Sequence, residues 1–176
     1  EIIPESKDTL RGVSMVGGKL FCHYLRNAQS RVLIYALDGQ SHTELKLPGI
    51  GSVGGLGGRM DDEATFFAFS SFTTPPTIYR YDIADGRTTI FRQPKVDFDP
   101  SHYETKQVFY KSKDGTQVPM FISYRKGLKP DGDNPTLLYG YGGVNVALTP
   151  SFSVPNLIWM EMGGIYAMAN LRGGGE

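Results

Sequence analysis

Residues from about Arg11 to Gln93 form short apolar or aromatic runs, which Gly, Asp, Asn and Pro separate at regular intervals. Such runs are typical of β-strands joined by tight turns, and helical periodicity is nearly absent from this part of the chain. The runs form two sets of four candidate strands: Gly12–Val16, Lys19–Leu25, Arg31–Leu37, Thr43–Leu47, Ser52–Leu56, Ala64–Phe69, Thr77–Ile83 and Thr88–Arg92. We therefore expect the first half to be all-β.

The two sets resemble each other at an offset of about 45 residues, the spacing of four-stranded β-propeller blades. Phe21 maps near Phe66, Ile34-Tyr35 maps onto Ile78-Tyr79, and an Asp-Gly turn follows the third strand of each set. Two blades cannot close a ring, and each face of a repeat needs a neighbour to bury it. The sequence therefore predicts a β-propeller segment of about two blades over residues 1–95, with further blades before residue 1.

After Pro94 the character of the sequence changes, and the polar connection 96–103 is the expected domain boundary. Two alternating runs, 106–112 and 117–125, flank the turn sequence Lys113-Asp114-Gly115-Thr116 and predict a hairpin. A buried strand at Thr136–Tyr139 is expected next. The order of these elements and of those that follow predicts that residues 96–176 begin an α/β-hydrolase domain.

The next two elements are a helix and a strand. A partly buried helix is predicted within Ser151–Met162, entered through Pro155. The apolar residues expected on it are Phe152, Leu157, Ile158, Trp159 and Met162. Gly164–Leu171 is almost continuously apolar, as expected for a strand buried on both faces of a parallel sheet.

The strand Thr136–Tyr139 leads into a turn in which Gly140, Gly142 and Gly143 surround Tyr141. In α/β-hydrolases one oxyanion donor comes from the loop after the third strand, where glycines let the backbone approach the substrate. Composition alone leaves a packing role for Tyr141 equally open, but its place at the end of a strand favours catalysis. We predict that the Tyr141 phenol donates to an oxyanion hole and that Tyr139 belongs to the core.

No Gly-x-Ser-x-Gly nucleophile elbow occurs in the 176 residues. Ser52, in the nearest similar sequence, lies between predicted propeller strands and is interpreted as structural. His23 and His42 also fall in the propeller segment, so neither is nominated as a general base. In this fold class the Ser, Asp and His of the triad follow the strands described above, so all three are expected beyond Glu176, and the chain alone is predicted to be inactive.

Two further polar clusters do not predict a bound ion. Asp97, Asp99, His102 and Glu104 lack the spacing that aims several ligands at one metal. The run Arg172–Glu176 lacks the glycine spacing and the lysine of phosphate-binding loops, and we expect a tight loop near the active-site face, with Arg172 and Glu176 in ion pairs. The sequence predicts neither a metal nor another cofactor.

The 18 basic and 18 acidic residues cancel, and no run of Lys or Arg suggests a nucleic acid or anionic membrane as partner. The apolar runs are shorter than the roughly 20 residues that a membrane-spanning helix needs. The lone Cys22 excludes an intramolecular disulfide and is expected to be a buried small apolar residue.

The chain begins at Glu1-Ile2-Ile3-Pro4, without Met or a signal-like segment, and ends within a glycine motif. We therefore expect an internal fragment whose partners include the remainder of its own chain, the missing blades and the catalytic C-terminal part. A cytoplasmic protein is expected, and a targeting signal upstream would override this.

In combination and in this order, the propeller segment, the Asp-rich junction 96–103, the sequence 113–122, the glycine turn 139–143 and the loop 172–176 resemble the prolyl oligopeptidase family of serine peptidases. The resemblance covers the whole chain and is strongest from Tyr103 onward. It implies a Ser-Asp-His peptidase that cleaves short peptides on the carboxyl side of proline, with the propeller excluding folded proteins. Tyr141 matches the oxyanion tyrosine of the family, and its partner would be a backbone N–H beside the serine.

The resemblance also places Gly142, Gly143 and Val144 at the substrate. Val144 stands where prolyl oligopeptidases usually have an aromatic side chain in the wall of the proline pocket, a departure that bears on selectivity. The related oligopeptidase B group, which cleaves after Arg or Lys, shares much of the same turn, but Gly143 and the sequence 147–153 are closer to the prolyl group. A propeller-based interaction protein whose hydrolase domain has lost its triad is the alternative from another class.

Overall fold

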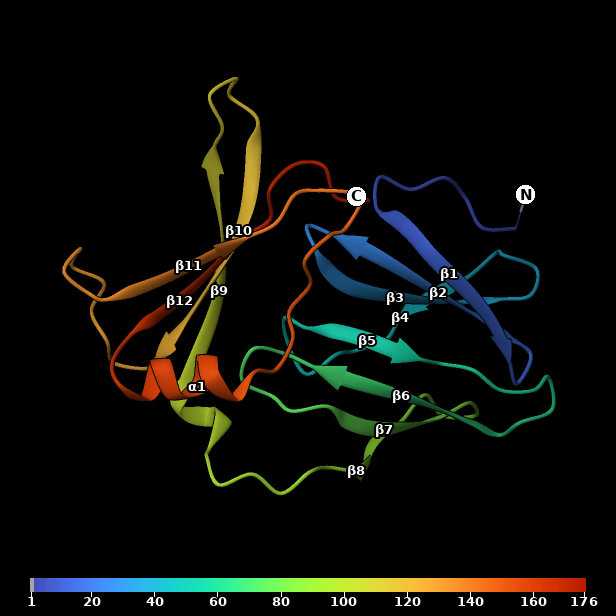
Figure 1. Cartoon of the computed structure of the whole chain (residues 1–176). Coiled ribbons are helices and arrows are strands. Elements are labelled where there is room, and N and C mark those ends of the chain that lie inside the picture. The colour runs from blue at the N-terminus through green and yellow to red at the C-terminus, as the bar shows by residue number, and fades with distance from the viewer. Residues whose placement is uncertain (1) are drawn as a thin grey trace.

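The structure is a computed structural model that describes residues 2–176. It contains three four-stranded sheets and one α-helix (Figure 1). The first sheet has the order β1 (Thr9–Val16), β2 (Lys19–Arg26), β3 (Gln29–Ala36) and β4 (His42–Glu44). The second has the order β5 (Ser52–Gly55), β6 (Ala64–Ser70), β7 (Thr77–Asp82) and β8 (Thr88–Arg92). These eight strands confirm the two predicted sets.

Both sheets are antiparallel meanders, and the first shows how the turns specify this arrangement. Gly17 and Gly18 both have positive φ, +55° and +71°, in the two-residue turn between β1 and β2. A two-residue hairpin turn needs this left-handed backbone because its twist then matches that of the strands. Asn27 and Ala28 adopt the same conformation between β2 and β3, with φ of 51° and 61°.

The two sheets face each other across one hydrophobic core. Phe21 of β2 meets Tyr81 of β7 edge to face at 5.6 Å between ring centroids, and within the second sheet Phe67 stacks on its strand neighbour Tyr79 at 5.2 Å. The predicted repeat is present: Phe21 faces the second sheet, and its predicted counterpart Phe66 lies on the face of the second sheet that points away from the first. Successive blades stack front to back, so counterpart side chains point the same way from blade to blade, and the predicted mapping of Tyr35 onto Tyr79 follows the same rule.

The third sheet has the order β11-β12-β10-β9. A short 3-10 turn, η1 (Pro100–His102), precedes it, and α1 (Val154–Glu161) lies between β11 and β12 in the sequence. Its strands are β9 (Tyr103–Lys111), β10 (Gln117–Arg125), β11 (Thr136–Gly140) and β12 (Ile165–Ala169). The predicted hairpin is β9 and β10, whereas β11 pairs with β12 in parallel.

The burial of the strands in this sheet agrees only in part with the prediction made from the sequence. All five residues of β12 are buried, as predicted for Gly164–Leu171. In contrast, all five residues of β11 are exposed, so the prediction of a buried strand is wrong, and Tyr139 is not a core residue. β11 is the edge strand, and within residues 2–176 nothing covers either of its faces sufficiently to bury it.

The helix α1 begins with Pro155 in its first turn, as predicted. Its buried residues are Leu157 and Met160, which pack against the third sheet. Ile158 and Met162, expected to contribute to the buried face, are exposed. The helix therefore buries a narrower stripe than its apolar composition indicates.

Side chains from the first two sheets enter the core of the third. Phe72, which follows β6, is 2% exposed and lies 5.5 Å from Phe121 and 5.7 Å from Tyr166 between ring centroids. Ala28, from the β2–β3 turn, belongs to the same buried cluster. The Ser52 hydroxyl also donates to the Pro150 carbonyl at 2.7 Å, a structural role as predicted for this serine.

Replacement of Phe72 by Ala should destabilise the chain by about 3 to 5 kcal/mol, because it removes a buried aromatic ring and leaves a cavity. Urea unfolding of the chain followed by circular dichroism measures this loss. Phe109→Ala is the matched control, since Phe109 is half-exposed on β9, and it should cost less than about 1 kcal/mol. Equal losses for the two variants would show that Phe72 does not join the sheets.

Candidate functional site

The carboxyl ends of β11 and β12 lie together because the two strands run in parallel, with Gly140 paired to Ala169. The turn that carries Tyr141 follows β11, and the loop Leu171–Glu176 follows β12. Loops at the carboxyl ends of parallel strands are where α/β proteins bind ligands. The strand pairing therefore brings the two glycine-rich segments of the sequence to one edge of the sheet.

Tyr141 is 43% exposed, and its ring folds back over its own turn. A Cβ atom at Gly143 would lie 3.2 Å from the phenolic oxygen of Tyr141. Glycine at this position thus allows the phenol to lie close to the backbone. The phenol lies near the turn, on a side chain that is partly exposed.

Val144 and Asn145 follow with φ of 45° and 64°. Left-handed backbone is uncommon for residues other than glycine and is unfavourable for a β-branched side chain. Val146 N donates to the Gly143 carbonyl at 3.1 Å and closes the turn. The Val144 side chain is 83% exposed, so it projects from this turn into solvent.

The Tyr141 turn packs backbone to backbone against the loop that follows β12. Asn145 N donates to the Gly173 carbonyl at 3.1 Å. A Cβ at Gly142 would collide with the Arg172 carbonyl oxygen, and one at Gly173 would collide with the Gly142 carbonyl. Glycine is required at both positions, because only a bare backbone permits this approach.

Arg172 connects the loop to the β9–β10 hairpin turn. Its guanidinium donates to Asp114 at 2.5 Å and to the Thr116 hydroxyl at 3.0 Å. The contact with Arg172 is the main reason that the pKa of Asp114 falls to about 2, and the Thr116 backbone N–H contributes to the same shift. The predicted ion pair of Arg172 is confirmed.

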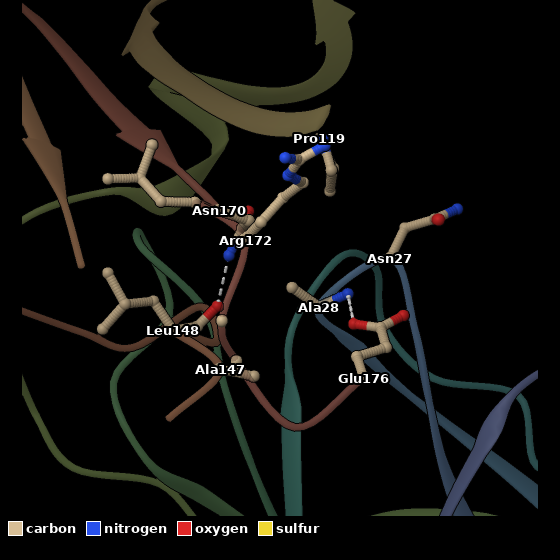
Figure 2. A pocket seen from close by; sticks show the side chains of 11 residues that line it. Asn27, Ala28, Pro119, Ala147, Leu148, Asn170, Arg172 and Glu176 are labelled. Carbon is tan, nitrogen blue, oxygen red and sulfur yellow. Dashed lines mark hydrogen bonds between the residues drawn. The ribbon is translucent and has the colours of Figure 1, made fainter. Parts of the chain in front are cut away.

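Glu176 was expected in an ion pair, but its carboxylate contacts a main-chain donor instead. Its carboxylate accepts a hydrogen bond from the Ala28 backbone N–H at 2.5 Å (Figure 2). The partner is thus a main-chain donor in the β2–β3 turn of the first sheet. This donor was not foreseen, because an amide in a hairpin turn normally faces solvent.

A pocket of about 380 Å³ lies between that turn and the loops at the end of the third sheet. Figure 2 shows Asn27 and Ala28 on one side and Leu148 and Asn170 on the other. Asn170 donates its side-chain N–H to the Leu148 carbonyl at 2.6 Å, and its Oδ1 is buried without a hydrogen-bond partner among the described residues. The sequence did not indicate this pocket, because its lining comes from widely separated segments.

The other polar candidates lie outside this site. His23 hydrogen-bonds to the Ser30 hydroxyl at 2.9 Å, and burial lowers the pKa of His23. His42 packs on Tyr35, and the buried Cys22 is the small apolar residue that the sequence predicts.

The Asp97–Glu104 segment does not bring its acidic residues together. Asp99 lies 3.7 Å from His102, whereas Glu104 pairs with Lys106. Among residues 2–176, no three His, Cys, Asp or Glu side chains converge as metal ligands would. In the same residues no helix is long and apolar enough to cross a membrane.

Comparison with known proteins places this geometry in context. The family model of the N-terminal β-propeller domain of prolyl oligopeptidase matches residues 1–94. A prolyl endopeptidase of Elizabethkingia miricola is 48% identical over 176 residues, which are all of this chain and 25% of that protein. The chain thus spans about a quarter of the length of this relative.

The chain is also similar to parts of solved structures of this family. One, from a structural and mechanistic analysis of two prolyl endopeptidases, matches with a TM-score of 0.91 and 46% identity, covering all of this chain and 26% of that one. Prolyl oligopeptidase B of Galerina marginata, bound to a 25-residue macrocyclization substrate, matches with a TM-score of 0.90 and 36% identity over 99% of this chain and 25% of that one.

Replacement of Arg172 by Ala should raise the pKa of Asp114 from about 2 toward its ordinary value of 3.8. A carboxyl whose pKa is depressed in the folded chain stabilises it above the ordinary value and loses that effect as the pH falls through about 2. The pKa should stay below 3.8 because Thr116 N still donates to Asp114. NMR titration of the carboxyl measures the shift.

Arg125→Ala is the control for that titration. Arg125 pairs with Glu161 on another part of the third sheet, so its loss should leave the Asp114 midpoint in place. An unchanged midpoint in the Arg172 variant would mean that the ion pair does not form in solution.

Proposed function

The chain belongs to the prolyl oligopeptidase family and contributes to its N-terminal β-propeller domain, and on this premise we propose that the whole protein is a serine-type oligopeptidase. The proposed reaction is hydrolysis of short peptides on the carboxyl side of proline. Its relatives are prolyl endopeptidases, and one relative structure holds a peptide substrate. We further propose that the protein acts in the cytoplasm.

We assign residues 1–95 to the propeller and residues 96–176 to the start of the peptidase domain. The boundary lies in the connection between β8 and β9. The second part has its own buried cluster, and its strands β11 and β12 are parallel with α1 between them in sequence. Parallel strands joined through a helix are the repeating unit of α/β domains, which supports this division.

The placement of Tyr141 is the observation that carries the proposed mechanism. The residue follows β11 at the carboxyl end of the strand, its phenol lies against Gly143, and the residue as a whole is partly exposed. During acyl transfer the scissile carbonyl oxygen becomes negatively charged, and a preorganised O–H donor stabilises that charge more than it stabilises the neutral substrate. The second donor in this mechanism is a backbone N–H beside the serine nucleophile, which lies outside the 176 residues.

Val144 is the residue that we propose to line the proline pocket. Its exposed side chain follows the glycine pair directly. A valine covers less of a pyrrolidine ring than an aromatic residue does, so the selectivity for proline should be less strict than with an aromatic wall. Cleavage after Arg or Lys, as in oligopeptidase B, is the alternative specificity.

The activity of the whole protein tests the proposed function. The protein should hydrolyse a fluorogenic peptide with proline before the scissile bond faster than a matched peptide with arginine there. The 176-residue chain alone should cleave neither and should take up no fluorophosphonate label, because it contains no nucleophile elbow. Preference for arginine would support the oligopeptidase B alternative, and an inactive whole protein would support the interaction-protein alternative.

Replacement of Tyr141 by Phe in the whole protein should lower kcat by about 100- to 1000-fold with little change in KM, because the lost donor acts on the transition state. Steady-state kinetics with the proline reporter measures both constants. Tyr139→Phe is the matched control, since Tyr139 is also exposed and lies two residues earlier, and its kcat should be unchanged. Full activity of the Tyr141 variant would make this residue a packing residue only.

A further inference from the structure

We propose that Glu176 is a positioning residue, whose carboxylate holds the loop Arg172–Glu176 on the β2–β3 turn of the propeller and thereby holds the Tyr141 turn in its working position. This proposal rests on the proposed function. It assigns a role to the contact between the two parts of the chain at the candidate site. The carboxyl end of the described chain lies next to the first sheet, as Figure 1 shows.

The β2–β3 turn is built to contact the third sheet. Ala28 is 2% exposed and packs in the buried cluster of that sheet, although it belongs to the first sheet. Its φ of 61° is a conformation that glycine adopts more readily, and glycine would lack the buried methyl group. The left-handed backbone also leaves the Ala28 N–H free of the β2–β3 ladder, whose closing pair is Arg26 and Gln29.

Three polar contacts join this turn and its neighbours to the other part of the chain. Ala28 N donates to the Glu176 carboxylate at 2.5 Å (Figure 2), and the Gln107 side chain donates to the Asn27 carbonyl at 2.6 Å. The Gln29 side chain donates to the Gln107 side-chain oxygen at 3.1 Å. A carboxylate acceptor makes the first contact charge-assisted, which strengthens it relative to a neutral hydrogen bond.

The loop held by Glu176 is the one that packs against the Tyr141 turn. Gly173 accepts from Asn145 N, and its backbone lies against the Gly142 carbonyl without room for a side chain. A shift of the loop must therefore move Gly142, the residue next to Tyr141. Arg172 holds the other end of the loop through Asp114. On the propeller side Glu176 holds the loop through its short contact with Ala28 N, beside a longer contact of 3.5 Å from the Arg11 guanidinium to the Gly175 carbonyl.

The geometry of an oxyanion donor is demanding, because its hydrogen bond to the developing charge must be about 2.7 to 3.1 Å long. A displacement of about 1 Å can reduce the rate by about 100-fold. An active site whose donor is held through the propeller contact works fully only when the propeller is seated against the peptidase domain. Glu176 thus makes turnover depend on the relative position of the two domains.

The test is a double-mutant cycle in the whole protein with Glu176→Ala and Tyr141→Phe. Glu176→Ala alone should lower kcat about tenfold, with KM changed less than about twofold, because the donor is displaced and the binding groups are retained. In the Tyr141→Phe background, Glu176→Ala should lower kcat by less than about twofold, because the donor that it positions is already absent. Glu176→Gln, which keeps an acceptor oxygen, should recover most of the activity.

Glu161→Ala is the matched control, since Glu161 is an exposed glutamate that pairs with Arg125 away from the Tyr141 turn. Its kcat should equal that of the parent protein. Gln107→Ala removes another hydrogen bond to the β2–β3 turn and should also lower kcat. Gln117→Ala is its control and should leave kcat unchanged, because Gln117 is exposed and makes no side-chain hydrogen bond among the described residues. These variants keep the proposal testable if Glu176→Ala fails to fold.

Hydrogen exchange measured by mass spectrometry on the whole protein gives a readout independent of activity. Peptides that contain Ala28 should exchange faster in Glu176→Ala than in the Glu161→Ala control. Unchanged exchange, or losses of kcat that multiply fully in the double variant, would overturn the positioning role. A parent protein without peptidase activity, or one unaffected by Tyr141→Phe, would instead overturn the proposed function.

Discussion

Five residues of β11 pair in parallel with β12, and the candidate site depends on this ladder. Parallel pairing brings the segments after both strands to one edge, although Tyr141 and Gly173 are far apart in sequence. Antiparallel pairing would place one of them at the opposite end of the sheet. The glycines then determine how closely the two loops approach, because Gly142 and Gly173 each lie against a carbonyl of the other loop.

The propeller sheets contribute to the site by supporting it. Phe72 and Ala28 enter the core of the third sheet, so the two parts share buried apolar surface and not only polar contacts. Apolar burial holds the propeller sheets against the third sheet but does not fix their relative orientation, because the hydrophobic effect is not directional. Hydrogen bonds are directional and can fix that orientation. The hydrogen bonds of Glu176 and Gln107 to the β2–β3 turn fix the relative orientation of the two parts close to the Tyr141 turn.

Much of the fold could be predicted from the sequence, because turn residues and alternating polarity are local signals. The strands Thr88–Arg92 and Gln117–Arg125 were predicted with the bounds that the structure has. The exposure of β11 could not be predicted, since an apolar run indicates only that a strand is suited to burial, and its position at the edge depends on the order of strands. The blade repeat was predictable because its anchors recur at a fixed offset, and Phe66 lies on the same blade face as Phe21 once the blades are stacked front to back.

The site was predictable to a similar degree. The glycines around Tyr141 are visible in the sequence, and they predict a turn that another backbone segment can approach closely. The partner of Glu176 was not predictable, because a backbone N–H carries no sequence signal and Ala28 is separated from it by most of the chain. The ion pair of Arg172 was expected, but its partner Asp114 became evident only when the hairpin turn was placed beside the loop.

The backbone strain at Val144 bears on the proposed function of this turn. A β-branched residue with φ of 45° is unfavourable, and packing does not offset that cost within the described structure, because the side chain is 83% exposed. Glycine or asparagine would satisfy the backbone with less strain. A costly residue that buries little is typical of a functional position, where the benefit arises from contact with a ligand. The same reasoning separates Val144 from Ala28, whose left-handed backbone is offset by the burial of its methyl group, and it supports the assignment of Val144 to the wall of the substrate pocket.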